Sequence, residues 1–275
     1  MKVSASASTR NRPPRDHAQA TCAAKADAFW GGPWPGDRSK IGLPDVTKLL
    51  LFDIDGTLIS SGGAGGRAMA RAFQDVFGFA NGLGSISMAG RTDAWIVAQM
   101  VAEHGLQHDA DRFRAFHDSY LRHLADEILL PGPQKGELAG VRPLLDTLVS
   151  HDNAYLALLT GNFKRGAEIK LEYFDLWRYF GAGAFGDDSH DRNGLLWKAL
   201  ANVEAAGGPH VRPSEVVIIG DTPLDIAVAV AGGARSVGVA TGNYDVDTLL
   251  ESGADVALPD LGDLDAVLDA LDLTR

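Results

Sequence analysis

An apolar run that ends in two closely spaced aspartates is the feature that most limits how this chain can fold. Residues 49–52 read Leu-Leu-Leu-Phe, and Asp53-Ile54-Asp55-Gly56-Thr57 follow at once. The run has the length and character of a buried strand, and Gly56 permits the tight backbone by which the chain leaves it. Side chains alternate along a strand, so Asp53 and Asp55 are expected on the same side. Carboxylates at the carboxyl end of a buried strand lie where open α/β sheets bind ligands, and a buried pair favours a cation site.

Two further apolar runs end in polar residues. Residues 155–159 are followed by Thr160, Gly161 and Asn162, and residues 216–219 are followed by Gly220-Asp221, with Asp225 four residues further on. Asp225 falls in the first turn of the expected next helix, where negative charge interacts favourably with the helix dipole.

Short apolar runs alternate with segments of helical periodicity along the rest of the chain. Strands are expected at 184–185, 236–239 and 256–258, and helices at 141–150, 164–179, 195–206, 224–231 and around 264–271. This alternation predicts an α/β fold, with a Rossmann-like parallel sheet core and helices on both faces. Three more helical patterns follow the first strand, at 67–77, 93–104 and 111–130, after a glycine-rich stretch at 60–66 that we expect to act as a flexible hinge. They predict an inserted all-helical domain.

The motifs DxDGT, T-G-N and GDxxxD, in that order, resemble the first, second and fourth signatures of the haloacid dehalogenase-like (HAD) hydrolase superfamily. The likeness is to its helical-capped, phosphoglycolate phosphatase-like branch and runs from about Lys48 to the end of the chain. It implies an α/β core of residues 47–61 and 140–275 and a helical cap of residues 62–139. Residues 1–46 are rich in Ala, Ser, Arg and Pro, and we expect them to form a disordered extension, with a transit peptide as the alternative.

The resemblance implies a Mg²⁺-dependent phosphatase that hydrolyses a small phosphate monoester through an aspartyl-phosphate intermediate. Asp53 would be the nucleophile and Asp55 the general acid and base. The phosphoryl oxygens would be held by Thr160, Gly161 and Asn162. The metal would be held by Asp53, the main-chain carbonyl of Asp55, Asp221 and, directly or as support, Asp225.

The third signature of the family supplies a basic residue that neutralises the nucleophile and the phosphoryl oxygens. Arg192 follows an acidic turn, as in one form of that motif, and is the preferred candidate, with Lys198 and Lys164 as alternatives. Arg91 precedes an expected helix in the segment Gly-Arg-Thr-Asp, and similar segments in capped relatives face the active site. We expect Arg91 to bind a distal anionic group of the substrate; the alternative is a helix start with Arg91 in solvent.

Other activities of the same motifs stay open. A phosphomutase of the superfamily differs only in what accepts the phosphoryl group. A haloacid dehalogenase would lack the second aspartate, and a non-catalytic phosphate-binding protein need not retain the full set. A net charge of -11 argues against nucleic acid or an anionic membrane as the main partner. The resemblance implies a small phosphorylated metabolite as the partner. The single cysteine, Cys22, and the lack of a long apolar run favour a cytoplasmic location, while the oligomeric state stays open.

Overall fold

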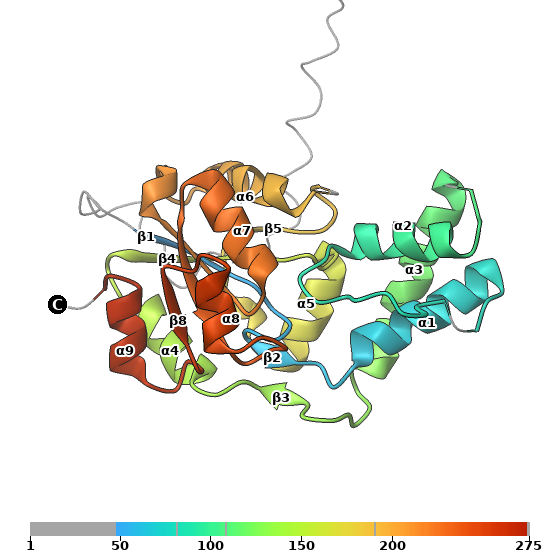
Figure 1. Cartoon of the computed structure of the whole chain (residues 1–275), viewed down its shortest axis with the longest axis horizontal. Helices are drawn as coiled ribbons and strands as arrows, with labels where there is room; N and C mark the ends of the chain where they lie inside the picture. The colour runs from blue at the N-terminus through green and yellow to red at the C-terminus, as the bar shows by residue number, and fades with distance from the viewer. Residues whose placement is uncertain (1–47, 81, 108, 190, 274–275) are drawn as a thin grey trace, which may run out of the picture. The chain divides into compact units, whose positions relative to one another are not determined.

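The computed structural model describes residues 48–80, 82–107, 109–189 and 191–273, so the extension expected at residues 1–46 lies outside the described residues (Figure 1). The described chain forms a six-stranded parallel sheet and a two-stranded antiparallel ribbon. The sheet confirms the predicted α/β fold. Its strands, in the order β5-β4-β1-β6-β7-β8, are β1 (Lys48–Phe52), β4 (Ala154–Leu159), β5 (Gly183–Ala184), β6 (Val216–Gly220), β7 (Arg235–Val239) and β8 (Val256–Leu258).

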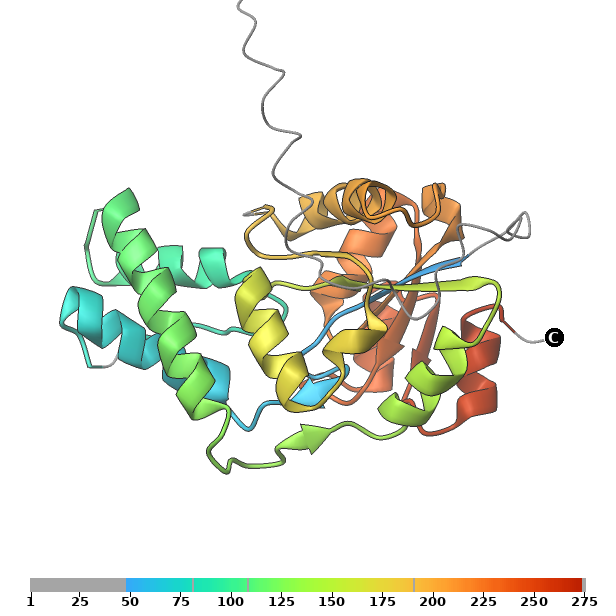
Figure 2. The same cartoon turned by 180° about the vertical axis from the view of Figure 1, so that it is seen from behind.

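Helices cover both faces of the sheet, and others lie together to one side of it (Figures 1 and 2). Among the described residues, no helix combines the length and the apolar character needed to span a bilayer. The helices are α1 (Ala64–Phe77), α2 (Asp93–Glu103), α3 (Ala110–Glu127), α4 (Val141–Val149), α5 (Lys164–Tyr173), α6 (Leu195–Ala205), α7 (Pro223–Gly232), α8 (Val246–Glu251) and α9 (Leu264–Ala270).

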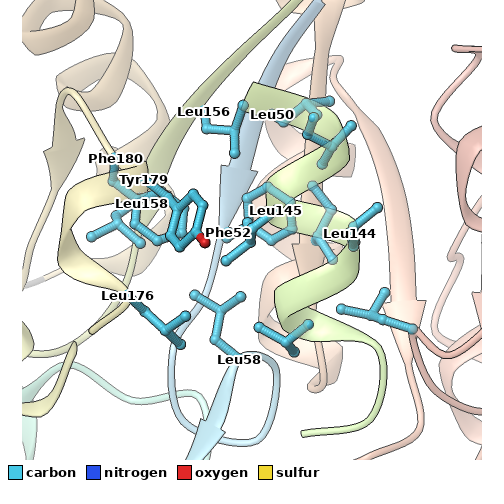
Figure 3. Packing of buried hydrophobic residues seen from close by; sticks show 14 of the residues in the cluster. Leu50, Phe52, Leu58, Leu144, Leu145, Leu156, Leu158, Leu176, Tyr179 and Phe180 are labelled. Atoms are coloured by element: carbon cyan, nitrogen blue, oxygen red, sulfur yellow. The ribbon is translucent and has the colours of Figure 1, made fainter. Parts of the chain in front are cut away.

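The central strand β1 is buried on both faces, which explains its uninterrupted apolar sequence. Leu50 and Phe52 point to one face, where they pack with residues of α4, α5 and α9 (Figure 3). Leu49 and Leu51 point to the other face and pack with residues of α6 and α7. Strand alternation therefore divides one apolar run between two cores.

Strand register brings the polar motifs to one edge of the sheet. Phe52, the last residue of β1, is level with Leu158 of β4 on one side and with Ile219 of β6 on the other. The three strands run parallel, so the residues that follow their carboxyl ends converge. Asp53 continues this pairing, since its N–H donates to the carbonyl of Ile219 at 2.9 Å.

Residues 61–135, here called the helical insert, leave and rejoin the sheet region through a short ribbon. Its strands, β2 (Ile59–Ser60) and β3 (Gly136–Glu137), pair antiparallel. The helices α1, α2 and α3 pack around their own apolar cluster, to which Phe163 contributes from outside the insert. The division into a core of 47–61 and 140–275 and a cap of 62–139 remains a prediction.

Several element boundaries differ from the sequence expectations. The helix expected to reach residue 179 ends at Tyr173, because Asp175 takes a positive φ of 54° and a short 3₁₀ helix, Trp177–Tyr179, follows. The glycine-rich stretch is not wholly a hinge, since α1 already begins at Ala64. The sequence did not indicate the ribbon β2–β3, helix α8, or the 3₁₀ helices at Arg192–Gly194 and Pro213–Glu215.

Candidate active site

A cavity of about 640 Å³ lies at the carboxyl ends of β1, β4 and β6 and is bounded on one side by the helical insert. Polar residues that follow the three strands line it, among them Asp53, Thr160 and Asp221. From the insert, Met69, Met88, Ile96 and Tyr120 line it as well. The residues that follow the strands are therefore polar and charged, and the insert adds apolar side chains together with Arg91 and Asp93.

Three buried carboxylates gather at the ends of β1 and β6, and two of them, Asp53 and Asp221, line the cavity. Oxygen atoms of Asp53, Asp221 and Asp225 lie within 4.8 Å of one another. Burial, together with the charges of Asp225 and Asp55, raises the pKa of Asp53 to about 7, although Arg192 and the Thr160 hydroxyl oppose the rise. Burial and the charges of Asp53 and Asp225 raise the pKa of Asp221 to about 8. Bringing these carboxylates together as anions is therefore unfavourable without a compensating cation.

Asp221 is the carboxylate of this group that pairs with no basic side chain among the described residues. Its Oδ1 accepts a hydrogen bond from the Thr57 hydroxyl at 3.3 Å. Gly56 and Gly242 pass so close that a Cβ on either would lie 2.5 or 1.8 Å from Asp221 Oδ2. Clustered carboxylate oxygens are the donors that Mg²⁺ prefers, so Asp53, Asp221 and Asp225 fit a divalent cation.

Arg192 lines the same cavity beside the carboxylates, in a 3₁₀ helix that leads into α6, and is only 8% exposed. Its guanidinium donates to Asp53 Oδ1 at 3.2 Å, to Asp225 Oδ1, and to the main-chain carbonyl of Gly90 at 2.9 Å. The alternatives Lys164 and Lys198 are both exposed and, in the described part of the chain, do not line the cavity. Of the three basic candidates, only Arg192 contacts Asp53.

Asp225 is held from two sides. Its Oδ2 accepts from the N–H and the hydroxyl of Thr222 at 3.1 and 2.7 Å, which closes a capping box at the start of α7, and its Oδ1 accepts from Arg192. Asp225 therefore orients the arginine that reaches Asp53, in addition to lying within the carboxylate cluster.

Asp55 points differently from the other acids. Strand β1 ends at Phe52, before either aspartate, and both Asp53 and Asp55 line the cavity. Its carboxylate lies outside the cluster of three and accepts hydrogen bonds from Lys170 at 2.6 Å and from Asn162 at 2.9 Å. The side chain is 38% exposed and lines the cavity. Asp55 thus faces the part of the cavity next to the insert.

Lys170 belongs to the site, and the sequence analysis missed it. It lies in α5, where Gly166, Ala167 and Leu171 are also buried. A lysine inside the buried stripe of an amphipathic helix is unusual, because lysine is almost never fully buried without a partner. That position within the stripe was the available signal.

The expected phosphoryl-binding loop is tightly bonded within itself. The Asn162 amide donates to the Thr160 hydroxyl at 2.8 Å as well as to Asp55, and its Oδ1 accepts from Lys170 at 2.6 Å. Gly161 lies against the main chain of the insert, where a Cβ would be 2.1 Å from the carbonyl oxygen of Arg91. All three loop residues line the cavity.

Arg91 is exposed, and its guanidinium carbon lies 4.4 Å from the ring centre of Trp95. It lines the main cavity and also a smaller one of about 300 Å³ between the insert and the start of α7. Thr92 is the N-cap of α2, and its hydroxyl accepts from Trp95 N–H at 3.2 Å. The helix start that was expected as the alternative is therefore present. Arg91 also borders the cavity, so the structure is compatible with both expectations.

Asp93 joins the insert to the phosphoryl-binding loop. Its N–H donates to the carbonyl of Gly161 at 2.7 Å, and its carboxylate accepts from the N–H of Phe163 at 2.8 Å. Burial raises the pKa of Asp93 to about 7, against the opposing effects of Lys170 and of the Phe163 hydrogen bond. From the sequence, Asp93 was expected only at the start of a helix, because its contacts with the loop after β4 depend on the tertiary fold.

Comparisons with known proteins agree with this geometry. Residues 47–233 match the family model of the haloacid dehalogenase-like hydrolases. No curated protein matches the chain. Among solved structures, a hydrolase from Pseudomonas syringae is 24% identical over 81% of this chain and 98% of its own, with a TM-score of 0.61.

Two further solved structures share the fold. A predicted phosphoglycolate phosphatase from Haemophilus somnus 129PT is 19% identical over 80% of this chain and 97% of its own, with a TM-score of 0.58. A Thermotoga maritima protein proposed to be a β-phosphoglucomutase is 21% identical over 81% of this chain and 99% of its own, with a TM-score of 0.51. At these identities the likeness concerns the fold.

Proposed function

Since the chain belongs to the haloacid dehalogenase-like hydrolase family, we propose that it is a Mg²⁺-dependent phosphatase acting on a small phosphate monoester. The observation that carries the proposal is Asp53, a buried carboxylate that contacts Arg192 and borders a cavity with Asp221 and Asp225 beside it. A nucleophile next to a fixed cation and a metal-compatible acid cluster is the arrangement that phosphoryl transfer requires.

The proposed reaction has two steps. In the first, a carboxylate oxygen of Asp53 attacks phosphorus while the bond from phosphorus to the ester oxygen breaks. The electron pair stays on the ester oxygen, which takes a proton from Asp55 and leaves as an alcohol. In the second, water attacks phosphorus and gives a proton to Asp55, and the electron pair of the phosphorus–Asp53 bond returns to the carboxylate.

The positions of the two aspartates suit these different tasks. Asp53 lies among the groups that would surround phosphorus, whereas Asp55 faces the insert side of the cavity, where a leaving group would lie. Arg192 would stabilise the anionic oxygens on the phosphoryl group, and Thr160 and Gly161 border the same space. Asn162 would act mainly by orienting Asp55, because its amide is already bonded there.

Asp53 and Asp221, with Asp225 beside them, are the residues that would hold Mg²⁺. When bound, the metal would supply positive charge that offsets both the crowded carboxylates and the anionic substrate. The raised pKa values of Asp53 and Asp221 support this proposal, because they arise from burial of the two carboxylates and from the charges of neighbouring aspartates, both of which a bound cation would offset.

A phosphomutase is the second candidate, because proteins of this fold proposed to be β-phosphoglucomutases match along more than four fifths of the chain. It would use the same residues and return the phosphoryl group to a second hydroxyl instead of to water. The insert side of the cavity, with Met69, Met88 and Ile96, leaves room for a small leaving group in either reaction.

The test is phosphate release from p-nitrophenyl phosphate and from a panel of small monoesters, with Mg²⁺ and with EDTA. Assays for sugar-phosphate isomers run in parallel. Phosphate release that needs Mg²⁺ and is lost in Asp53→Asn supports the phosphatase. Isomer formation without phosphate release would favour the mutase, and the absence of both activities across the panel would refute the proposal.

A further inference from the structure

Lys170 is a buried cation to which the proposed reaction assigns no task. It is 4% exposed, and its ammonium donates to Asp55 Oδ2 and to Asn162 Oδ1, both at 2.6 Å. Helix α5 thus carries a charge into the wall of the cavity, two turns after the phosphoryl-binding loop.

Stability alone does not explain a lysine at this position. Removing the Lys170 ammonium from water costs several kcal/mol, and replacing a buried ion pair by apolar residues is often neutral or stabilising. The neighbours of Lys170 on the buried side of α5, Ala167 and Leu171, are apolar and would accommodate an apolar side chain. The charge is therefore better explained by what it does to Asp55.

The contacts around Asp55 fix one of its two oxygens. Oδ2 accepts from both Lys170 and Asn162, and the same two side chains also bond to each other, so the three groups form a closed set. Asp55 Oδ1 has no hydrogen-bond partner within the described ranges of the chain, and the side chain is partly open to the cavity. One oxygen is held, and the other is available to a ligand.

The helical insert covers this arrangement with a glycine. A Cβ on Gly65, in the first turn of α1, would lie 3.3 Å from Lys170 Nζ and 3.6 Å from its Cε. Glycine at this point lets the backbone of α1 pass over the ammonium without displacing it. The glycine-rich start of α1 thus serves packing against Lys170.

We propose that Lys170 is a positioning residue that holds Oδ2 of Asp55 so that Oδ1 meets the leaving-group oxygen. The proposal rests on the phosphatase function given above and concerns only the group that transfers the proton. Lys170 itself need not touch phosphorus. Loss of Lys170 would leave Asp55 free to rotate, with only Asn162 to hold it.

The role has a distinctive kinetic signature. Proton transfer to the leaving oxygen matters for an alkyl phosphate, whose alkoxide is a poor leaving group, and hardly matters for p-nitrophenyl phosphate, whose phenolate is stable. kcat/KM reports the steps up to phosphoenzyme formation, so it isolates this difference. Lys170→Met should lower kcat/KM for glycerol phosphate about 10- to 100-fold, which is at or below the lower end of the roughly 10²–10⁴-fold range for general acid catalysis, and should change kcat/KM for p-nitrophenyl phosphate less than about threefold.

A double-mutant cycle separates positioning from a structural role. If Lys170 acts through Asp55, the double variant Asp55→Asn/Lys170→Met should be no slower on glycerol phosphate than Asp55→Asn alone. Lys198→Met, which alters an exposed lysine of α6, is the matched control and should equal wild type on both substrates. Additive losses in the double variant would overturn the proposal.

Gly65→Ala is a second test of the positioning role, and it keeps the Lys170 ammonium instead of removing it. It remains informative should Lys170→Met not fold. The new methyl would lie 3.3 Å from Lys170 Nζ, so the ammonium must shift by a few tenths of an ångström. kcat/KM for glycerol phosphate should fall several-fold, since a misplacement of about 1 Å can cost on the order of 100-fold. Equal losses on both substrates in either variant would refute positioning while leaving the phosphatase intact. A wild-type protein inactive on every monoester would instead refute the proposed function.

Discussion

Asp93→Asn should stabilise the protein, and by an amount that grows with pH. Asp93 joins α2 to the loop Gly161–Phe163, and burial raises its pKa from an ordinary 3.8 to about 7. Asparagine retains an oxygen that can accept the N–H of Phe163 but has no charge to bury. The substitution therefore isolates the cost of ionising this one buried carboxyl.

The sign follows from proton linkage. In the unfolded chain Asp93 loses its proton near pH 3.8, whereas in the folded protein it keeps the proton until about pH 7. The folded state binds more protons between these values, so this group's contribution to stability falls as pH rises. The raised pKa of Asp93 costs about 2 kcal/mol of stability at pH 5 and about 4 kcal/mol at pH 8. Before rounding, the advantage of the asparagine variant should grow by roughly 2–3 kcal/mol over that interval.

Urea denaturation at pH 5, 6, 7 and 8 measures the difference in unfolding free energy between variant and wild type. Other titrating groups are common to both proteins and cancel in that difference. Asp75→Asn is the control, and it should lower the free energy of unfolding where Asp93→Asn raises it. The reason is that the hydrogen bonds from His123 and Ser119 lower the pKa of Asp75. A difference for Asp93→Asn that stays flat or shrinks toward pH 8 would refute the reasoning.

The remaining predictions concern the reaction. Asp53→Asn should lower turnover of p-nitrophenyl phosphate by several orders of magnitude with the fold kept; near wild-type activity in a folded variant would exclude Asp53 as nucleophile. EDTA should abolish phosphate release and Mg²⁺ restore it, and the thermal midpoint should rise with Mg²⁺ in wild type but much less in Asp221→Ala; undiminished hydrolysis in chelator contradicts the site. Arg192→Ala should be nearly inactive while Lys198→Ala matches wild type, since only Arg192 contacts Asp53; the reverse pattern would reassign the basic residue. Arg91→Ala should cost about 1.5–3 kcal/mol in kcat/KM for a monoester with a second anionic group and little for p-nitrophenyl phosphate; equal losses on both would indicate a structural role.

The sequence allowed the sheet to be predicted because each strand carries its own signal. β1, β4 and β6 are short apolar runs that end in polar motifs, and their order along the chain is enough to place those motifs at one edge. The two-residue strands β2 and β3 carry no such signal, since Ile59–Ser60 and Gly136–Glu137 are too short for any periodicity.

The orientation of individual side chains could not be predicted in the same way. The hydrogen-bond partners of Asp55 include Lys170, which lies more than a hundred residues further along the chain, so they could not be foreseen from the motif itself. The second role of Asp93, as a bond between α2 and the loop after β4, likewise depends on a tertiary contact. Such contacts are indicated in the sequence only indirectly, for example by Lys170 among the apolar residues on the buried side of α5.

The short ribbon has a consequence for how proteins of this kind can be recombined. Ile59 lies opposite Glu137 and Ser60 opposite Gly136, so the helical insert starts and finishes at neighbouring points. A segment whose ends already meet can be lengthened, shortened or exchanged without a new demand on the sheet for chain closure. A chimaera joined after Ser60 and before Gly136 would replace the insert side of the cavity with residues from another protein and keep the same carboxylates. The new segment would have to restore the contacts with Gly161 and Lys170.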